Sequence, residues 1–448
     1  MAQHTGSPDP GKWFDSAHAS LCALGAHLRR IGFFTPLEEA VHIKQKVCKY
    51  TPVQKLEMIF VSLLAGATTV AETGTTLRVD PAVQRAFGLP GCADQSVLAE
   101  TLNAATEEDV ADLRGAVEAI IQQHSQACRH DFAQALLVLD LDLSPLPTRT
   151  RGEGVERGYM GRNRAKTGRK LVRVRAATGE TLWEDILPGR TVEDLSVVQL
   201  AVGAVERLLG LADDTAAVQA QRGRVEWRLD SGWGSDAILN WLLGRGYQVT
   251  AKIKSSSRVR KLVRPIQTWQ PTSSPGREVA PVLTPVELAR PTQQYAVRTP
   301  SKKKAGGYQY AVLLTSRPEF GMLGTVDHYD ARAAVEADLK GDKYGLGLGV
   351  LRKRKLAAQR VLLLLGQLAH NVLLWARTWL ATHVPRLAEL GIVRLVREVW
   401  AIPGRVKLAG GLLQRVRLRP EHPRARDVCS GLRALLTPSQ IALCLAQR

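Results

Sequence analysis

The feature that most constrains the fold is a change of pattern near residue 133. Beyond it, ALLVLDLDL, KLVRVRAA and TLWEDIL have the length, the alternation and the apolar content of β-strands. VEDLSVVQLAVGAVERLLG then has helical spacing, VEWRLD resembles a strand, SDAILNWLLGRG a helix and YQVTAKIK a strand. The order strand-strand-strand-helix-strand-helix-strand predicts an α/β domain that begins at about residue 131 and runs to about residue 254.

Acidic residues end two of these strand-like runs. Asp142 ends LLVLDLD, and Asp230 ends VEWRLD. Asp140 lies two residues before Asp142, so on a strand both side chains point to the same side. Two acids on one face of a core strand are costly unless they are paired or bind a metal. Asp142 and Asp140 are therefore alternatives for one ligand position, and Asp230 is a candidate for another.

A third acid lies in YDARAAVEADLKGDK, which has the spacing Y-x2-R-x3-E-x6-K. On a helix, its Tyr329, Arg332, Glu336 and Lys343 fall at roughly 0°, 300°, 340° and 320°, within an arc of about 60°. One i, i+4 ion pair would explain two of these residues but not all four. An acid beside two cations and a phenol suits a site that holds a metal ion and a phosphate. Three carboxylates from separate segments suit a pair of divalent cations.

These residues resemble the DDE transposases of bacterial insertion sequences, in the group whose prototype is insertion sequence four. GYMGRNRAKTGRK and LDSGWGSDAILNWLLGRGYQVTAKIK resemble segments of the same family, in the same order, and the likeness covers roughly residues 50–400. It implies a ribonuclease-H-like catalytic domain with a β-rich insertion, preceded by an all-α N-terminal domain.

The resemblance also implies roles for single residues. Asp142, which precedes Leu143 and Ser144 as in the family's D-x-S/T pattern, would be a catalytic metal ligand with Asp230 and Glu336. The cofactor would be two Mg²⁺ ions, with Mn²⁺ as a substitute. The phosphates near the cleaved DNA end would be contacted by Tyr329, Arg332 and Lys343.

The implied function is cut-and-paste DNA recombination by a bacterial transposase. Its partners would be double-stranded DNA with terminal inverted repeats, a target DNA and a second copy of the chain. Close relatives pass through a DNA hairpin and hold a flipped base on an aromatic residue of the insertion. Trp269 is the candidate here, and Trp233 is a second one. The alternatives are a nuclease of the same fold that never joins strands, and a domesticated DNA-binding protein without catalysis.

A strongly basic composition fits a polyanionic partner. The chain has 448 residues and a formal net charge of +19, which favours nucleic acid first and an anionic membrane surface second. The densest cluster spans residues 149–175, and a second one spans residues 252–264. Such density suits phosphate-backbone contacts whose affinity falls steeply with salt, although a solubilising face is the alternative. From the first cluster we predict DNA contacts at Arg162, Arg164, Lys166, Arg169 and Lys170.

Composition shifts along the chain predict its domains. We expect a disordered leader over 1–12, a helical N-terminal DNA-binding or scaffold domain over 13–130, the first part of the catalytic core over 131–254, a proline-rich insertion subdomain over 255–327, the second part of the core over 328–380, and a basic helical C-terminal region over 381–448. The apolar stretch 360–380 contains Gln367, His370 and Asn371, so we expect a buried helix and no membrane span. Six cysteines without metal-binding spacing, and no secretory signal, predict a cytoplasmic, nucleoid-associated protein.

Overall fold

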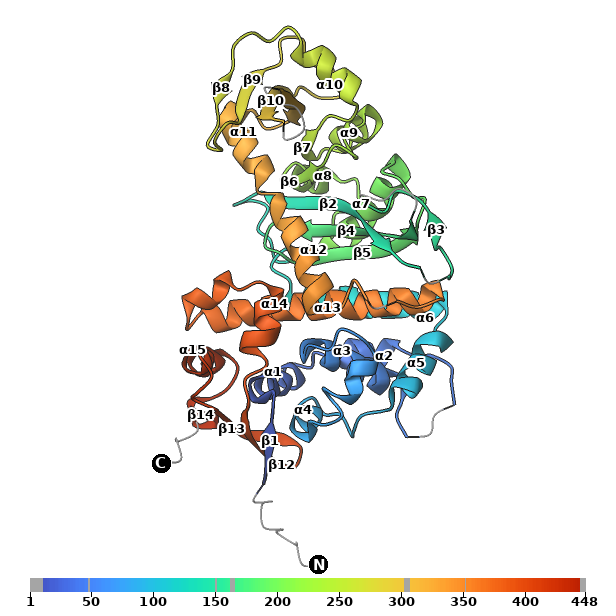
Figure 1. Cartoon of the computed structure of the whole chain (residues 1–448), viewed down its shortest axis with the longest axis vertical. Coiled ribbons are helices and arrows are strands. Elements are labelled where there is room, and N and C mark those ends of the chain that lie inside the picture. The colour runs from blue at the N-terminus through green and yellow to red at the C-terminus, as the bar shows by residue number, and fades with distance from the viewer. Residues whose placement is uncertain are drawn as a thin grey trace, which may run out of the picture. The chain divides into compact units, whose positions relative to one another are not determined.

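The computed structural model describes residues 11–46, 49–149, 151–161, 166–301, 307–350 and 352–443. The chain divides into two compact units (Figure 1). Unit 1 combines Met1–His124, Thr150–Glu153 and Asp338–Arg448, and unit 2 combines Ser125–Arg149 and Gly154–Ala337. The expected α/β class is confirmed at the level of mixed helices and sheets.

Unit 2 is built on a sheet of ten strands among the described residues. The strands are β2 (Leu137–Pro147), β3 (Glu156–Arg157), β4 (Thr167–Ala176), β5 (Thr181–Pro188), β6 (Val225–Leu229), β7 (Gln248–Lys252), β8 (Gln270–Pro271), β9 (Glu278–Pro281), β10 (Gln293–Pro300) and β11 (Tyr308–Thr315). Five of them follow the order β5-β4-β2-β6-β7. β4 is antiparallel to both β5 and β2, whereas β2, β6 and β7 are parallel.

Helices connect the parallel strands of this sheet. Unit 2 contains α7 (Leu195–Leu209), α8 (Ala216–Arg222), α9 (Asp236–Gly244), α10 (Ser256–Val263) and α11 (Gly321–Asp330), with a short 3₁₀ turn at Pro318–Phe320. α7 begins where the Asp194 side chain accepts a hydrogen bond from the Val197 N–H, and it ends at Gly210, whose φ of 70° favours glycine. The seven elements predicted between residues 131 and 254 are all present, and β3 and α8 are additional ones.

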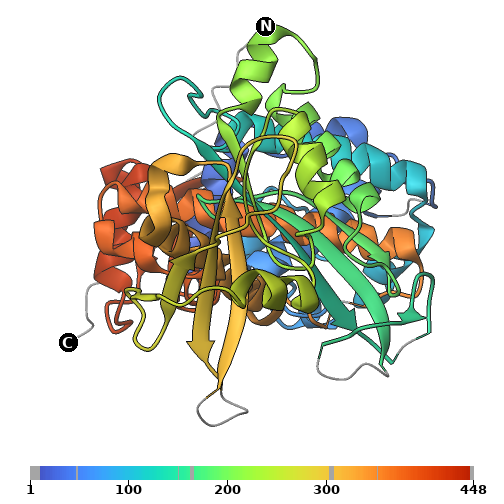
Figure 2. The same cartoon turned by 90° about the horizontal axis from the view of Figure 1, so that it is seen from above.

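The proline-rich segment differs from the expected separate subdomain. Its strand β11 pairs antiparallel with β7, opposing Leu313 to Lys252, and β10, β9 and β8 follow outward. In Figure 2 the gold strands of this segment lie beside the green strands of the first part of the unit. The inserted strands extend the main sheet because β7 would otherwise be an edge with unpaired backbone groups.

Unit 1 contains most of the described helices. They are α1 (Ala19–Arg30), α2 (Thr35–Ala40), α3 (Pro52–Leu64), α4 (Pro81–Ala86), α5 (Gln95–Ala104), α6 (Glu107–His124), α13 (Leu356–Ala381), α14 (Ile392–Arg394) and α15 (Ala425–Gly431), with a π-helical turn at Leu395–Val399 and short 3₁₀ turns at Ala71–Gly74, Pro385–Glu389, Leu432–Ala434 and Pro438–Gln440. α12 (Ala333–Gly345) begins in unit 2 and ends in unit 1.

The long apolar helix α13 is the core of unit 1. It is the one described helix that is long and apolar enough to cross a membrane, but most of it is buried. It packs against α3, α5 and α6 (Figure 1). Its polar His370 is fully buried and lies 2.7 Å from Asp342, measured from Nδ1 to Oδ1. The prediction of a buried helix is therefore confirmed.

A small sheet corrects the prediction of purely helical terminal regions. It joins β1 (Lys12–Ser16) to β12 (Gly404–Ala409), β13 (Leu412–Leu418) and β14 (Ile441–Leu443) in that order. The guanidinium groups of Arg405 and Arg417 lie 5.4 and 4.7 Å from the centre of the Trp13 ring. Part of the basic C-terminal charge thus packs on an aromatic residue from the other end of the chain. Residue 12, predicted as leader, already belongs to β1.

Candidate active site

Two of the predicted acids lie just beyond the paired stretch of two neighbouring parallel strands, Asp142 within β2 and Asp230 directly after β6. The pairing of β2 with β6 runs from Leu137 opposite Val225 to Leu141 opposite Leu229. The next residues in this register are Asp142 and Asp230. Because adjacent strands lie about 4.8 Å apart, the two acids are placed side by side. Strand pairing thus brings together residues that are 88 positions apart in the sequence.

Asp142 is held by a residue from the Y-x2-R-x3-E-x6-K segment. Arg332 Nη2 donates to Asp142 Oδ1 at 2.9 Å and to the Leu141 carbonyl oxygen at 3.2 Å. The Ser144 hydroxyl donates to Asp142 Oδ2 at 2.8 Å. Both carboxylate oxygens are engaged, but each has a further lone pair that can accept from a ligand.

Asp230 lies in a tight turn directly after β6. Its Oδ1 accepts the Gly232 N–H at 2.9 Å, and its carbonyl oxygen accepts the Trp233 N–H at 3.2 Å. The side chain is half-buried. The Gly232 Cα faces the carboxylate closely, since a Cβ built there would be 3.1 Å from Asp230 Oδ1. The turn therefore fixes the carboxylate at the end of the strand.

Three further groups share the electrostatic environment of these acids. Burial lowers the pKa of Lys252, and the charge of Arg277 adds to this effect. The Lys252 ammonium lies 4.8 Å from the centre of the Tyr329 ring. Burial raises the pKa of Tyr329, and Asp230 contributes in the same direction. Tyr329 is therefore a neutral phenol at physiological pH.

Arg332 is the central cation of the site. Burial alone would lower its pKa, but Asp142, Tyr329 and Asp230 outweigh that effect, so the pKa is raised. Its Nε is buried and has no hydrogen-bond partner among the described residues. This guanidinium therefore has one donor that the described residues leave without an acceptor.

Asp140 has a different environment from Asp142. It is fully buried, and Arg228 binds both of its oxygens at 2.8 Å, from Nε and Nη2. Arg175 Nη1 lies 3.7 Å from the same carboxylate. A buried carboxylate bound by two guanidinium groups is a structural ion pair. This favours Asp142 as the candidate ligand, and Asp140 as part of the core.

The prediction of four residues on one continuous helix is corrected. α11 ends at Asp330, and α12 begins at Ala333, so Arg332 lies in the turn between them. Tyr329 packs in an apolar cluster with Val279, Tyr295, Val297, Leu313 and Val326, whereas Arg332 is drawn toward β2. These tertiary contacts override the helical spacing of the sequence. Lys343 lies near the other end of α12, in unit 1.

Glu336 is exposed and lies one turn beyond Arg332, about 6 Å along the helix. No group of three or more His, Cys, Asp or Glu side chains that could hold a metal occurs among the described residues. The strand register places Asp142 and Asp230 next to each other, while Glu336 is not grouped with them.

Several predicted DNA contacts are corrected by burial. Arg169 and Lys170 are only 4% and 5% exposed in β4. The Lys170 ammonium donates to the Tyr159 carbonyl oxygen at 2.6 Å, and burial lowers its pKa. Lys166 is exposed at the start of the strand, as a phosphate contact requires. Arg162 and Arg164 lie outside the described residues.

The second basic cluster is at the surface and borders a cavity beside Asp230. The cavity measures about 650 Å³. Its lining includes Ser231, Gly232, Lys252, Lys254, Arg260, Tyr308 and Tyr310. Lys254 and Arg260 are exposed. A cationic cavity with aromatic walls next to a candidate catalytic acid can accept a nucleotide.

Trp269 belongs to an aromatic cluster at this end of the unit. The Arg298 guanidinium lies 4.5 Å from the centres of both the Trp269 and the Tyr308 ring. The Trp269 ring lies 6.1 Å from Tyr310, between ring centres. Trp233, the second candidate, is fully buried and is therefore a core residue.

The sequence analysis missed Tyr308 and Tyr310 as site residues and assigned Lys252 only to the second basic cluster. The alternation in YQYAVLLTS could have identified the two tyrosines, because residues two apart on a strand face the same side. The comparisons with known proteins add no identity: no protein-family model matches the chain, and no curated protein matches it.

Proposed function

We propose that the protein is a DDE transposase that cuts and rejoins DNA at the ends of a mobile element. The observation that carries the proposal is the meeting of three distant sequence segments in unit 2. Asp142 within β2 and Asp230 after β6 directly follow the parallel pairing of these two strands, and Arg332 of the Y-x2-R-x3-E-x6-K segment binds Asp142 at 2.9 Å. A helical surface motif without function would not be expected to contact this pair of acids.

The topology of the sheet supports a ribonuclease-H-like core. Counted along the chain, β2, β4, β5, β6 and β7 form the spatial order 3-2-1-4-5, with the first three antiparallel and the last two parallel to the first. This is the arrangement that the strand and helix order of the sequence predicts for such a core. The inserted strands β8–β11 precede the segment with Glu336, as the family resemblance implies.

The roles of the residues follow from their chemistry. Asp142 and Asp230 would hold a divalent cation between them, and Glu336 would complete the ligand set when DNA is bound. A bound pair of Mg²⁺ ions would activate the attacking oxygen and stabilise the leaving oxygen of the phosphodiester. Arg332 keeps the Asp142 carboxylate oriented through a hydrogen bond from Nη2. Tyr329 remains neutral and packs beside Lys252.

Surface cations supply the means of holding DNA. Lys254, Arg260, Lys261 and Arg264 are exposed on and around α10, near the cavity beside Asp230. Lys166 is exposed near the start of β4. With a net charge of +19, such a surface suits a bacterial, nucleoid-associated protein. The family resemblance further suggests a homodimer that brings two DNA ends together.

The experiment that tests the proposal uses the DNA that flanks the gene. Inverted repeats on both sides would supply the substrate. We expect Mg²⁺-dependent cleavage of a duplex that carries the repeat, followed by joining of its 3′ end to a second duplex. Binding should weaken steeply with salt, with a slope of log K against log[salt] of about −3 or steeper. Denaturing gels of end-labelled DNA measure cleavage and joining, and gel shifts measure binding.

The outcomes separate the proposal from its rivals. Cleavage without a joined product would identify a nuclease of the same fold. Binding without cleavage in Mg²⁺ or Mn²⁺ would identify a domesticated DNA-binding protein. A scrambled duplex of the same length is the control, because it retains phosphate contacts but lacks the repeat.

The proposal includes a hairpin at the cleaved end. Stacking of an unpaired base on an aromatic face is worth about 1–3 kcal/mol, and Trp269 with Tyr310 lies beside the cationic cavity. We expect a labelled species of doubled strand length, and a roughly tenfold lower yield of it for Trp269→Ala. Trp241→Ala, a half-buried tryptophan on α9, is the matched control. Normal hairpin yield in Trp269→Ala would make this tryptophan structural.

A further inference from the structure

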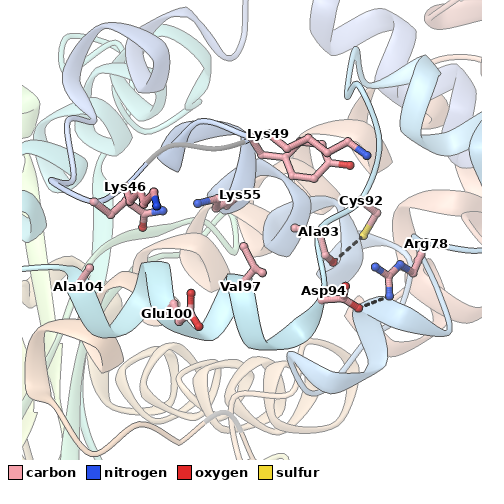
Figure 3. A pocket seen from close by; sticks show the side chains of 12 residues that line it. Lys46, Lys49, Lys55, Arg78, Cys92, Ala93, Asp94, Val97, Glu100 and Ala104 are labelled. Atoms are coloured by element: carbon pink, nitrogen blue, oxygen red, sulfur yellow. Dashed lines mark hydrogen bonds and ion pairs between the residues drawn. The ribbon is translucent and has the colours of Figure 1, made fainter.

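A separate cavity lies in unit 1, within its helical part. It measures about 510 Å³ and is open to one side of α3 and α5 (Figure 3). It is lined by Gln45, Lys46, Lys49, Tyr50, Lys55, Arg78, Cys92, Ala93, Asp94, Val97, Glu100 and Ala104. All of these residues belong to unit 1, so the cavity is distinct from the candidate active site. The catalytic proposal assigns it no role.

Lys55 is the decisive residue of this cavity. Its side chain is almost completely buried, with 4% of the residue exposed. Figure 3 shows it extending from α3 into the space between Lys46 and Val97. Among the described residues no ion pair or hydrogen bond is found for its ammonium group, which lines the cavity. An anion in the cavity would provide this charge with a partner.

The other charges around the cavity do not neutralise Lys55. Arg78 and Asp94 pair with each other, and Lys49 lies over the Tyr50 ring at 5.2 Å. Lys46 is exposed at the rim, and so is the acid Glu100. Apart from the Arg78–Asp94 pair, the charged groups of the lining are the ammonium groups of Lys46, Lys49 and Lys55 and the carboxylate of Glu100. The cavity therefore has a net positive charge.

A second unsatisfied group points to a missing ligand. The Gln45 Oε1 atom is buried and has no hydrogen-bond partner within the described part of the chain. It lines the same cavity as Lys55. A ligand that offers both a hydrogen-bond donor and an anion would satisfy the two groups together.

The remaining walls suit an apolar or planar substituent. Tyr50, Ala93, Val97 and Ala104 supply aromatic and aliphatic surface. A volume of about 510 Å³ lies within the range of cavities that hold small ligands, roughly 300–1,000 Å³. A mononucleotide combines an anionic phosphate, a planar base and N–H donors in this size range.

We propose that this cavity binds a phosphate group that carries a nucleoside. Lys55, Lys46 and Lys49 bind the phosphate, and the base lies against Tyr50 and Val97. The same chemistry has two possible sources, a free nucleotide or the terminal nucleotide of a DNA strand. In either case the site is a binding site without catalysis, in the unit that does not hold Asp142 and Asp230.

The test uses the full-length protein with dAMP, inorganic phosphate and a 20-base-pair duplex as probes. We expect Lys55→Met to weaken the binding of the natural ligand, a free nucleotide or a DNA end, by about tenfold or more. The reason is that a hydrogen bond to a charged group is worth about 1.5–3 kcal/mol. If the source is a free nucleotide, calorimetry gives saturable dAMP binding to the wild type and weaker binding to the variant. If the source is DNA, duplex affinity falls by the same factor while dAMP gives no saturation.

Two controls separate binding from folding. Lys44→Met removes an exposed lysine outside the lining and should leave every affinity within about twofold, because an exposed charge is screened by salt. Without ligand, Lys55→Met should melt at the same temperature or higher, because the Lys55 ammonium has no ion pair or hydrogen bond to lose among the described residues. Val97→Phe, which narrows the cavity, should weaken nucleotide binding but not inorganic phosphate binding.

Two results overturn the proposal. One is unchanged affinity of Lys55→Met for dAMP and for the duplex. The other is a clear fall of its melting temperature without ligand, which would make Lys55 a structural residue. Neither result bears on DNA cleavage, because the residues tested lie outside the candidate active site.

Discussion

Asp230→Asn is expected to lower the rate of DNA cleavage by about 1,000-fold or more, with DNA binding changed only a few-fold. A metal-held phosphodiester gains several kcal/mol of transition-state stabilisation from its ligands, and about 4 kcal/mol corresponds to a factor of about 1,000. The amide keeps the shape of the carboxylate and can still accept the Gly232 N–H. Asp142→Asn is expected to have the same effect. Single-turnover cleavage of an end-labelled duplex in Mg²⁺ measures the rate, and gel shifts measure binding.

A matched control distinguishes chemistry from general charge. Asp213→Asn changes an exposed acid of unit 2 away from the β2 and β6 strand ends and should cut at the wild-type rate. Glu336→Gln tests the third ligand in the same assay, and a loss like that of Asp230→Asn would place Glu336 in the site of the DNA-bound protein. Full activity of Asp142→Asn, Asp230→Asn or Glu336→Gln would remove the substituted residue from the catalytic set.

The positions of Asp142 and Asp230 could be predicted because their signal is local. Each acid follows an apolar run, and parallel pairing places equivalent positions of neighbouring strands side by side. The predicted strand end at Asp142 is wrong, because β2 continues to Pro147. The sequence could not reveal that Arg332 would contact Asp142 from a turn between two helices. The helical spacing assumes one continuous helix. In the structure, Tyr329 packs in an apolar cluster whereas Arg332 binds Asp142.

The number of basic residues near residue 170 did not predict which of them are exposed. Arginines on a strand are expected at the surface, but Arg173 and Arg175 of β4 are buried beside acids of the adjacent strands. Arg173 donates from Nε to Glu184 Oε2 at 2.6 Å, with both side chains almost fully buried. Only the order of the strands identifies which cations remain available for DNA. The same long-range pairing explains why a strand at Lys12–Ser16 was missed, since its partner β12 is nearly 400 residues away.

The largest effect on stability is expected for Asp140→Asn. Asp140 is fully buried, and Arg228 binds it through two hydrogen bonds of 2.8 Å. The amide of asparagine would direct its N–H₂ group at a guanidinium donor and would leave the Arg228 charge uncompensated. Removal of one partner of a buried ion pair costs about 3–5 kcal/mol. Urea unfolding should show this loss in the free energy of unfolding, with an unchanged dependence on urea concentration.

The same variant tests which acid of β2 is catalytic. Below its unfolding temperature, Asp140→Asn should still cut DNA, because its carboxylate serves the core. Asp142→Asn should show the reverse pattern, a lost activity with a smaller loss of stability, since Asp142 is partly exposed and asparagine Oδ1 can still accept from Arg332. If Asp140→Asn abolished cleavage while Asp142→Asn cut normally, the candidate ligand would be Asp140. The ion pair with Arg228 would then have to open for the metal to bind.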